Sequence, residues 1–347
     1  MNIPLIPMIV AAISTFAAIL LIRPFAISID LVDRPNNRKK HYGSVPLIGG
    51  LAMFFGIVIS IIVLTFDLNQ YDYFLISSLI IVTIGVLDDH QNISVSLRLV
   101  FQILAALIIV TVGDSSIQSL GNLLGSGDIL LYKWTYFISV LALICGMNAI
   151  NMSDGIHGLA GGTSLVTFLS ILYLSIGSIF EKHILIAFLF CAVLPIFLIH
   201  NLCIGISKRH RIFMGDAGSM FIGLVIAWLL INLSQGENRA FEPVTALWIF
   251  ALPLFEIFAT TFRRVTSKKS IFKPDLNHSH HILIRLGFRQ KTTLTILISF
   301  SISLALIGIL GEQYQIDTWI MFYGFLLTFL LYIISFKLVL RKFKNGS

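Results

Sequence analysis

The sequence predicts an all-α integral membrane protein, a polytopic helical bundle with about eleven transmembrane helices. Its 347 residues are 57% hydrophobic and only 12% charged, about half the charged fraction of a typical soluble protein. Apolar runs of ~20 residues, the length that crosses the ~30 Å hydrocarbon core of a bilayer, recur along the whole chain. The chain has neither an internal repeat nor a low-complexity tract, so we expect one domain over residues 1–347.

The first apolar run has no basic segment before it, because the first Arg is Arg23. We therefore expect this run to stay in the protein as a span, although a signal peptide is the alternative. The predicted spans are about 3–22, 47–66, 72–87, 97–113, 132–147, 162–180, 184–203, 217–234, 244–262, 292–311 and 318–336. Cys145, Cys191 and Cys203 lie inside apolar runs without metal spacing, which indicates small hydrophobic residues rather than ligands or disulfides.

The loops between the spans form two alternating sets of very different charge. Of the 24 Lys and Arg residues, one set contains only Lys133, Lys182 and Arg239. The positive-inside rule makes the other set cytoplasmic, with the N-terminus outside and the C-terminus inside. The net charge of +7 therefore reflects topology and attraction to anionic membrane lipids, and it does not indicate a nucleic-acid partner.

Basic residues gather in the first cytoplasmic loop, at Arg38, Lys39 and Lys40. Next to a membrane, such residues can pair with a phosphate in the head-group zone. A stop-transfer loop would explain the same charges. The prolines and glycines that lead from this loop into the second span weaken that alternative, because they fix the loop against the bundle.

Two adjacent carboxylates, Asp88 and Asp89, close the third predicted span. Each faces the negative end of a helix dipole, which costs a few tenths to ~1 kcal/mol, and both stand at the membrane boundary, where ionisable groups are usually functional. A divalent cation or a shared proton would relieve their repulsion. A solvated helix end is the alternative.

A polar, Gly-rich stretch over residues 148–162 separates the fifth and sixth spans and contains Asn148, Asn151, Asp154 and His157. Asn151 and Asp154 offer oxygen ligands of the kind that Mg²⁺ prefers. An ordinary interhelical turn with Asn caps is the alternative. It does not explain why polar residues begin at Asn148, within reach of the apolar span.

Asp216 stands between two glycines just before the eighth span. It is either the N-cap of that helix or part of a phosphate site at the helix N-terminus. Its predicted position on the same membrane side as Asp88, Asp89 and Asp154 favours the second interpretation.

The longest cytoplasmic loop contains Arg264 and three histidines, His278, His280 and His281. Zinc is one interpretation of three His in four residues, but no nearby Cys or well-spaced carboxylate completes a tetrahedral set. His and Arg together favour a pyrophosphate and hydroxyl-rich ligand. For His280 and His281 a solvated helix start is the alternative.

Four motifs, in a fixed order between the spans, carry a resemblance to a known family. They are Asp88-Asp89, Asn148-x-x-Asn151-x-x-Asp154-Gly155-x-x-Gly158-Leu159, Met214-Gly215-Asp216-x-Gly218-Ser219 and His278-x-His280-His281. With them the chain resembles the polyprenyl-phosphate N-acetylhexosamine-1-phosphate transferases from about Asp33 to Gly287. The resemblance implies an enzyme that transfers a sugar-1-phosphate from a UDP-N-acetylhexosamine to undecaprenyl phosphate and releases UMP.

Within this family, residues 272–287 are similar to the branch that transfers GlcNAc-1-phosphate. Lipid I synthases have a Pro-Ile-His-His-His arrangement there and ten spans. The resemblance therefore implies the first step of a lipid-linked surface glycan, of O-antigen, common-antigen or teichoic-acid type. It also implies the bacterial cytoplasmic (inner) membrane, an active site that faces the cytoplasm, and a homodimer as an option. Other UDP-N-acetyl sugars stay open as donors.

The resemblance also implies roles for the residues. Mg²⁺, with Mn²⁺ as an alternative, would bind Asp216, supported by Asp154 and Asn151. Asp88 or Asp89 would orient or deprotonate the acceptor phosphate, unless an Asp is the nucleophile of a double displacement. The other predicted substrate-binding residues are Arg38, Lys39 and Lys40 for the lipid phosphate, Arg264, His278, His280 and His281 for the donor, and Asn148, Asn151 and His157 in the Gly-rich stretch.

His157 departs from the family pattern, which usually reads Asp-Gly-x-Asp-Gly-Leu. Because Mg²⁺ prefers oxygen ligands, we expect His157 to contact the donor or its phosphate rather than the metal.

Two other functional classes stay open for the protein. The first is a transporter, which would need charged residues at mid-span, whereas here the polar motifs collect at one membrane face. The second is a non-catalytic lipid-binding protein, which would be a degenerate member of the family.

Overall fold

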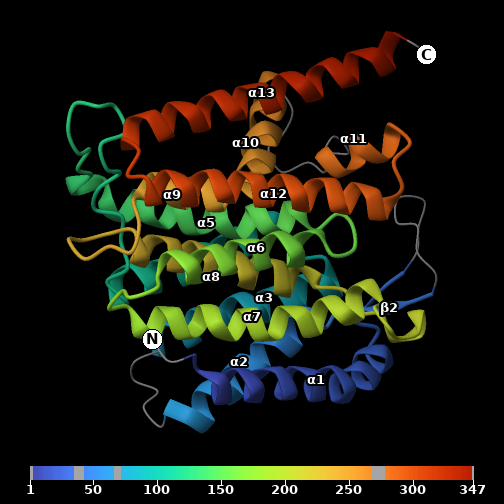
Figure 1. Cartoon of the computed structure of the whole chain (residues 1–347). Coiled ribbons are helices and arrows are strands. Elements are labelled where there is room, and N and C mark those ends of the chain that lie inside the picture. Colours follow the sequence, from blue (N-terminus) through green and yellow to red (C-terminus); the bar gives the residue numbers. More distant parts are fainter. Residues whose placement is uncertain (1–2, 35–42, 66–71, 268–277, 346–347) are drawn as a thin grey trace.

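The structure is a computed structural model that describes residues 3–34, 43–65, 72–267 and 278–345. Within these ranges its regular secondary structure is almost entirely helical, and most of the helices run side by side along one bundle (Figure 1). The elements are α1 (Leu5–Ser28), β1 (Val32–Asp33), β2 (Val45–Pro46), α2 (Gly49–Thr65), α3 (Asp72–Gln91), α4 (Val95–Leu107), η2 (Ile108–Val112), η3 (Tyr132–Trp134), α5 (Thr135–Ser153), α6 (Leu159–Leu174), α7 (Glu181–Leu202), η4 (Lys208–His210), α8 (Gly215–Leu233), α9 (Pro243–Ile249), α10 (Ala251–Thr266), α11 (Ser279–Arg285), α12 (Gln290–Gln313) and α13 (Thr318–Asn345).

The helices agree with the predicted membrane class. Among the described residues, eight helices are long and apolar enough to cross a membrane, and the bent pair α9–α10 is a ninth candidate. The shorter apolar helices α2 and α6 overlap the second and sixth predicted spans. The prediction of a multi-pass helical membrane protein is confirmed. The count of eleven spans and the orientation stay predictions.

The predicted ninth span, 244–262, is not one helix. The structure breaks it into α9 and α10, whose axes differ by 83°. The cause is Pro253, near the start of α10. A proline has no N–H to donate, and its ring collides with the carbonyl four residues earlier. That carbonyl belongs to Ile249, the residue at which α9 ends.

The centre of the bundle is α8, which is apolar along its length and has almost all of its residues buried. A helix that is hydrophobic all round belongs inside a protein rather than on its surface. It packs against α2, α3 and α5. Gly50 on α2 and Gly218 on α8 lie so close that a Cβ on Gly50 would stand 2.1 Å from the Cα of Gly218. The first turn of α8 is therefore held tightly against its neighbours.

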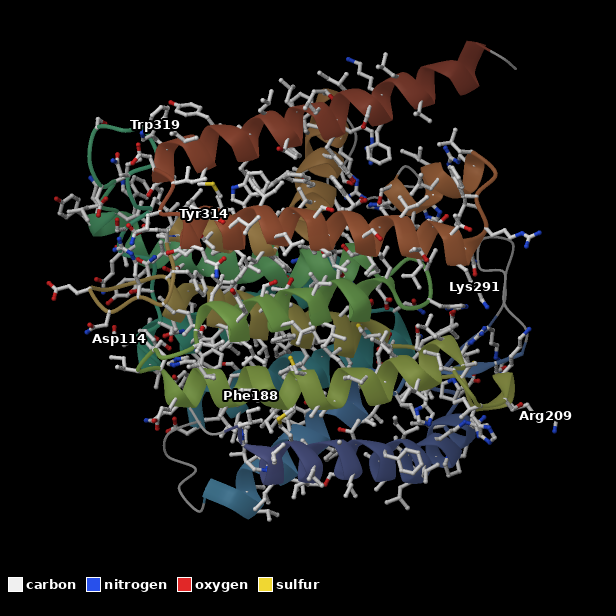
Figure 2. All side chains as sticks on the ribbon, in the orientation of Figure 1. Asp114, Phe188, Arg209, Lys291, Tyr314 and Trp319 are labelled. Atoms are coloured by element: carbon white, nitrogen blue, oxygen red, sulfur yellow. The ribbon has the colours of Figure 1, made fainter. Side chains whose placement is uncertain are left out.

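The two ends of the bundle differ in the residues that they carry. Arg209 and Lys291 lie at one end, here named the basic end, and Asp114, Tyr314 and Trp319 lie at the other (Figure 2). Both α11 and β2 lie at the basic end, and the start of α1 and the end of α13 are at opposite ends (Figure 1). The histidine motif, which belongs to α11, therefore lies at the basic end, and so does the Asp216 motif, because the segment before α8 bonds to the residues of and after β2.

A short antiparallel sheet at the basic end connects distant parts of the chain. In it β1 pairs with β2 in the register Val32↔Pro46. The backbone of and after β2 also bonds to Phe213. The N–H of Phe213 donates to the carbonyl of Pro46 at 2.9 Å, and the N–H of Gly49 donates to the carbonyl of Phe213 at 2.9 Å. The segment before α8 is thereby bonded to the loop that leads into α2.

Candidate active site

The N-terminus of α8 is capped by a side chain from another helix. Asp89, near the end of α3, accepts the backbone N–H of Asp216 at 2.9 Å and that of Ala217 at 3.3 Å. The first N–H groups of a helix have no partner within it, and the helix dipole favours a negative charge there. Gly215 has φ +73°, and a Cβ on it would stand 2.4 Å from Asp89 Oδ2. Only glycine fits between the cap and the helix.

The carboxylate of Asp216 turns away from this cap. Its Oδ1 accepts the amide of Asn151 at 2.7 Å, and the same Asn151 nitrogen donates to Ser219 Oγ at 2.9 Å. The side chain of Asp216 is 37% exposed. Asn151 therefore fixes the carboxylate in a position that solutes can reach. Asp216 is not the N-cap of α8, since that task belongs to Asp89.

Arg98, in the first turn of α4, brings the two acidic motifs together. One of its guanidinium nitrogens lies 2.7 Å from Asp88 Oδ2 and 3.5 Å from Asp216 Oδ2. Asp88 is only 7% exposed, and a carboxylate so far from water needs a paired cation. Arg98 is not among the residues predicted for the site. Its sequence context could have indicated a functional role, because Arg98 is the single charged residue of the predicted span 97–113.

Asn148 lies one turn deeper in the bundle than Asn151. Its amide donates to Gln102 Oε1 at 2.9 Å and to the carbonyl of Ile144 at 2.8 Å. The buried Gln102 in turn donates to Met220 Sδ at 3.1 Å. These contacts join α4, α5 and α8 beneath the acidic cluster. A direct contact of Asn148 with substrate stays a prediction.

His157 lies between two residues of the segment that precedes α8. Its ring stacks on Phe213, with centroids 5.1 Å apart, and its Nε2 lies 3.3 Å from the guanidinium of Arg211. Because a guanidinium can only donate, Nε2 is the acceptor of this bond and carries no proton. His157 thus anchors Arg211 next to the Gly-rich stretch.

A buried side chain that the sequence analysis did not single out, Asn201 at the end of α7, joins the same two segments. It accepts the N–H of Gly158 at 2.7 Å and donates to the carbonyl of Ile212 at 2.9 Å. Its signal in the sequence was weak, since a single Asn at the end of an apolar run is common. The bonds show why an amide is needed: it offers one acceptor and one donor at once.

The histidine segment packs against the Gly-rich stretch. His280 is 2% exposed, and its ring packs so closely against Gly155 that a Cβ there would stand 2.1 Å from Nε2. Burial, together with the charge of the neighbouring His281, lowers the pKa of His280 to about 3. His280 is therefore neutral at physiological pH. Its Nε2 has no hydrogen-bond partner in the structure.

The remaining predicted residues occupy different places. Asp154 is exposed and forms the C-cap of α5, and Arg264 belongs to the last turn of α10. His278 is buried beside Glu256. Arg38, Lys39 and Lys40 lie outside the described residues. None of these roles is tested by the geometry alone, and they stay predictions.

No group of three or more His, Cys, Asp and Glu side chains among the described residues has the arrangement to hold a metal ion. The acidic residues form a smaller unit, in which Asp88 and Asp216 share Arg98.

Comparison with known proteins decides the family. The sequence model of glycosyl transferase family 4 matches residues 71–234, which run from α3 to α8. The chain is 38% identical over 328 residues to the undecaprenyl-phosphate alpha-N-acetylglucosaminyl 1-phosphate transferase of Haemophilus influenzae, an overlap of 94% of this chain and 92% of the relative. The chain belongs to glycosyl transferase family 4.

Further members of family 4 agree with this result. The proteins of the same description from Escherichia coli O157:H7 and Yersinia pestis are 37% identical over 317 residues and 36% identical over 321 residues. The overlaps cover 89% and 92% of this chain, and 84% and 87% of the relatives. The predicted resemblance and the predicted transferase class are confirmed, and the family 4 match includes the whole Asp88, Asp89, Asn151 and Asp216 cluster.

Proposed function

We propose that this protein transfers GlcNAc-1-phosphate from UDP-GlcNAc to undecaprenyl phosphate, with release of UMP. The product would be the first intermediate of a lipid-linked surface glycan. The observation that carries the proposal is the similarity, over about nine-tenths of the chain, to transferases of this description. The acidic cluster at the basic end supports it, because it gathers residues of α3, α4, α5 and α8 at one point.

In the proposed reaction, positioning and charge neutralisation do most of the work, as is usual in phosphoryl transfer. Asp216 would meet the donor's pyrophosphate, since it is the cluster's solvent-reachable carboxylate. Asn151 would hold that carboxylate in place, and Asp89 would hold the helix that carries it.

The acidic cluster has a donor set that fits Mg²⁺. Asp88 and Asp216 are two carboxylates on one guanidinium, so one negative charge is left over. Mg²⁺ is usually held by one or two carboxylates together with substrate phosphates. When bound, it would neutralise charge on the donor's pyrophosphate. Asp154 and Asn151 remain the proposed supporting ligands, and Mn²⁺ remains an alternative.

The acceptor phosphate would approach Asp88 and the basic residues Arg38, Lys39 and Lys40. Asp88 is the better candidate than Asp89 to act on this phosphate, because both oxygens of Asp89 already accept backbone N–H groups. A polyprenyl phosphate near neutral pH needs little help to ionise, so Asp88 would mainly orient it. A double displacement through an Asp nucleophile is the alternative mechanism.

The donor would lie beside the Gly-rich stretch and the histidine segment, which pack against each other. His280 would face it as a neutral imidazole, since burial keeps its pKa at about 3. Arg264, His278 and His281 complete the proposed donor side. We place this site at the cytoplasmic face of the bacterial cytoplasmic membrane, because the basic loops belong there by the positive-inside rule. Homodimer formation stays a prediction.

The test uses purified protein with labelled UDP-GlcNAc, undecaprenyl phosphate and Mg²⁺. We expect a lipid-linked labelled product and an equal amount of UMP, both lost when EDTA removes the metal. A panel of UDP-N-acetyl sugars in the same assay identifies the donor. Absence of product with every sugar would instead favour a non-catalytic lipid-binding protein.

A further inference from the structure

Glu256 is a carboxylate in the interior of the bundle that belongs to neither acidic motif. It lies on α10, three residues after Pro253, and is only 5% exposed. A single carboxylate buried this deeply is expensive unless its oxygens accept several hydrogen bonds. The structure supplies three donors.

The donors come from α11 and α13. Glu256 Oε1 accepts the backbone N–H of Ser279 at 3.0 Å and the hydroxyl of Tyr332 at 2.8 Å. Its Oε2 lies 3.0 Å from His278 Nδ1, which must donate because a carboxylate only accepts. One side chain thus joins the end of the long loop to α13.

These bonds make Glu256 the cap of α11. The helix begins at Ser279, its N-cap His278 makes no capping bond with its own side chain, and Glu256 accepts the first N–H in its place. A helix of seven residues has little stability of its own. Its position therefore depends on what holds its first turn.

The position of α11 decides where His280 lies. His280 is the second residue of α11, its ring is parallel to that of His278 with centroids 5.7 Å apart, and it packs against Gly155. Gly155 follows Asp154 in the stretch that leads from Asn151. A continuous set of contacts therefore runs from Tyr332 through Glu256 and the histidines to the stretch that flanks the acidic cluster.

We infer that Glu256 is a positioning residue for the donor side of the site: it caps α11, orients His278 and so seats His280 against Gly155. The inference rests on the proposed function, in which the histidine segment meets the UDP-sugar. It does not give Glu256 a contact with substrate. Tyr332 acts on the same carboxylate and extends this support to α13.

The chain offers a matched control in Glu312. This residue of α12 also accepts a backbone N–H from another segment, that of Glu242 at the start of α9 at 3.0 Å, and it accepts the hydroxyl of Thr245. It stands two residues before Tyr314, which lies at the end of the bundle opposite the basic end (Figure 2). Glu312→Gln therefore removes a similar capping carboxylate far from the histidines.

The experiment compares Glu256→Gln with Glu312→Gln in the full-length protein. We expect Glu256→Gln to raise the KM for UDP-GlcNAc about tenfold, with the KM for undecaprenyl phosphate unchanged and the thermal midpoint lowered as in Glu312→Gln. Glu312→Gln should leave both KM values within about twofold of wild type. An unchanged donor KM in Glu256→Gln, or an equal rise in Glu312→Gln, would overturn the inference.

Two gentler variants serve if Glu256→Gln does not fold. Tyr332→Phe removes one of the three bonds, and Ser279→Pro removes the N–H at the first helical position, where proline is tolerated. Each should raise the donor KM about threefold. If both leave it at the wild-type value, Glu256 does not position the donor site.

A second measurement does not depend on turnover. In Glu256→Gln, amide hydrogen exchange should become faster in residues 279–285 and 153–158, and in Glu312→Gln it should not. Faster exchange in both segments supports the inference even if the wild-type protein uses none of the UDP-sugars, a result that would count only against the proposed function. Unchanged exchange in residues 153–158 would refute the link to Gly155.

Discussion

Asp89 and Asp216 meet through the backbone, since the carboxylate of Asp89 accepts the N–H of Asp216 at 2.9 Å. The carboxylate of Asp216 is turned elsewhere, toward Asn151 and Arg98. Two residues of the same type therefore have different tasks: one fixes the start of α8 and the other is presented to solutes. The first two predictions separate these tasks.

Asp89→Asn should lower both stability and activity. An amide keeps one acceptor oxygen but points an NH₂ group at one of the two N–H donors of α8. Loss of a helix cap costs about 1 kcal/mol, so the thermal midpoint should fall by a few degrees. UMP release should fall at least tenfold. An unchanged midpoint would contradict the capping role.

Asp216→Asn should abolish UMP release with little loss of stability. Asn151 can still donate to the side-chain oxygen at this position, so the local geometry is kept and only the charge is removed. Turnover and thermal midpoint are measured together, at saturating Mg²⁺. Wild-type turnover under these conditions would rule out Asp216 as the metal ligand.

Arg98→Met should destabilise the protein, because it leaves the buried Asp88 without its cation. Breaking a buried pair costs several kcal/mol, and since Arg98 is partly exposed we expect about 2–3 kcal/mol. Arg239→Met is the matched control. It breaks an exposed pair with Glu242, which is worth under about 1 kcal/mol. Equal shifts of the thermal midpoint in the two variants would contradict the prediction.

His157→Asp should keep the contact with Arg211, now as an ion pair, and lose the stacking on Phe213. We expect kcat/KM for UDP-GlcNAc to stay within about threefold of wild type. His157→Leu keeps the bulk and loses the acceptor, and it should lower kcat/KM at least tenfold. If the Leu variant matches the wild type, position 157 has only a packing role.

His280 should make the protein less stable in acid. Its pKa in the folded protein is about 3, below the ordinary value of about 6.5. As the pH falls below 6.5, His280 therefore becomes protonated in the unfolded chain while it stays neutral in the folded protein. From pH 7 to pH 5 this lowers the free energy of unfolding by about 2 kcal/mol.

The check for His280 is the thermal midpoint at pH 7 and pH 5. His280→Asn should lose less stability over this range than wild type, and His90→Asn, a change at an exposed position, should behave like wild type. If the thermal midpoint of the wild type falls by the same amount from pH 7 to pH 5 as that of His280→Asn, His280 is not a buried, neutral imidazole.

Much of the architecture follows from local sequence patterns. Each predicted span overlaps an apolar helix, because ~20 apolar residues specify a span without regard to distant partners. The break at Ile249 has a local cause in Pro253, but the proline rule alone would not have located it, because α1 and α7 continue past Pro24 and Pro195.

The contacts within the site could not be predicted in this way. Arg98 joins Asp88 to Asp216, a residue 118 positions further along the chain than Arg98, and Glu256 meets Tyr332 across 76 positions. Such pairs depend on how helices pack, which periodicity does not encode. A charged residue inside an apolar run is the one local signal that marks them, and Arg98 and Glu256 both show it.

The bonds between residues 46–49 and Phe213 have a consequence for the order of assembly. A chain that is still being synthesised has made its first loop and the second helix long before Phe213 exists, so residues 46–49 can pair with β1 but lack Phe213 for more than 160 residues. Contacts at such separations form late because a long loop must be closed first. The acidic cluster then becomes complete only when α8 enters the bundle, and premature termination before that point leaves no partly working site.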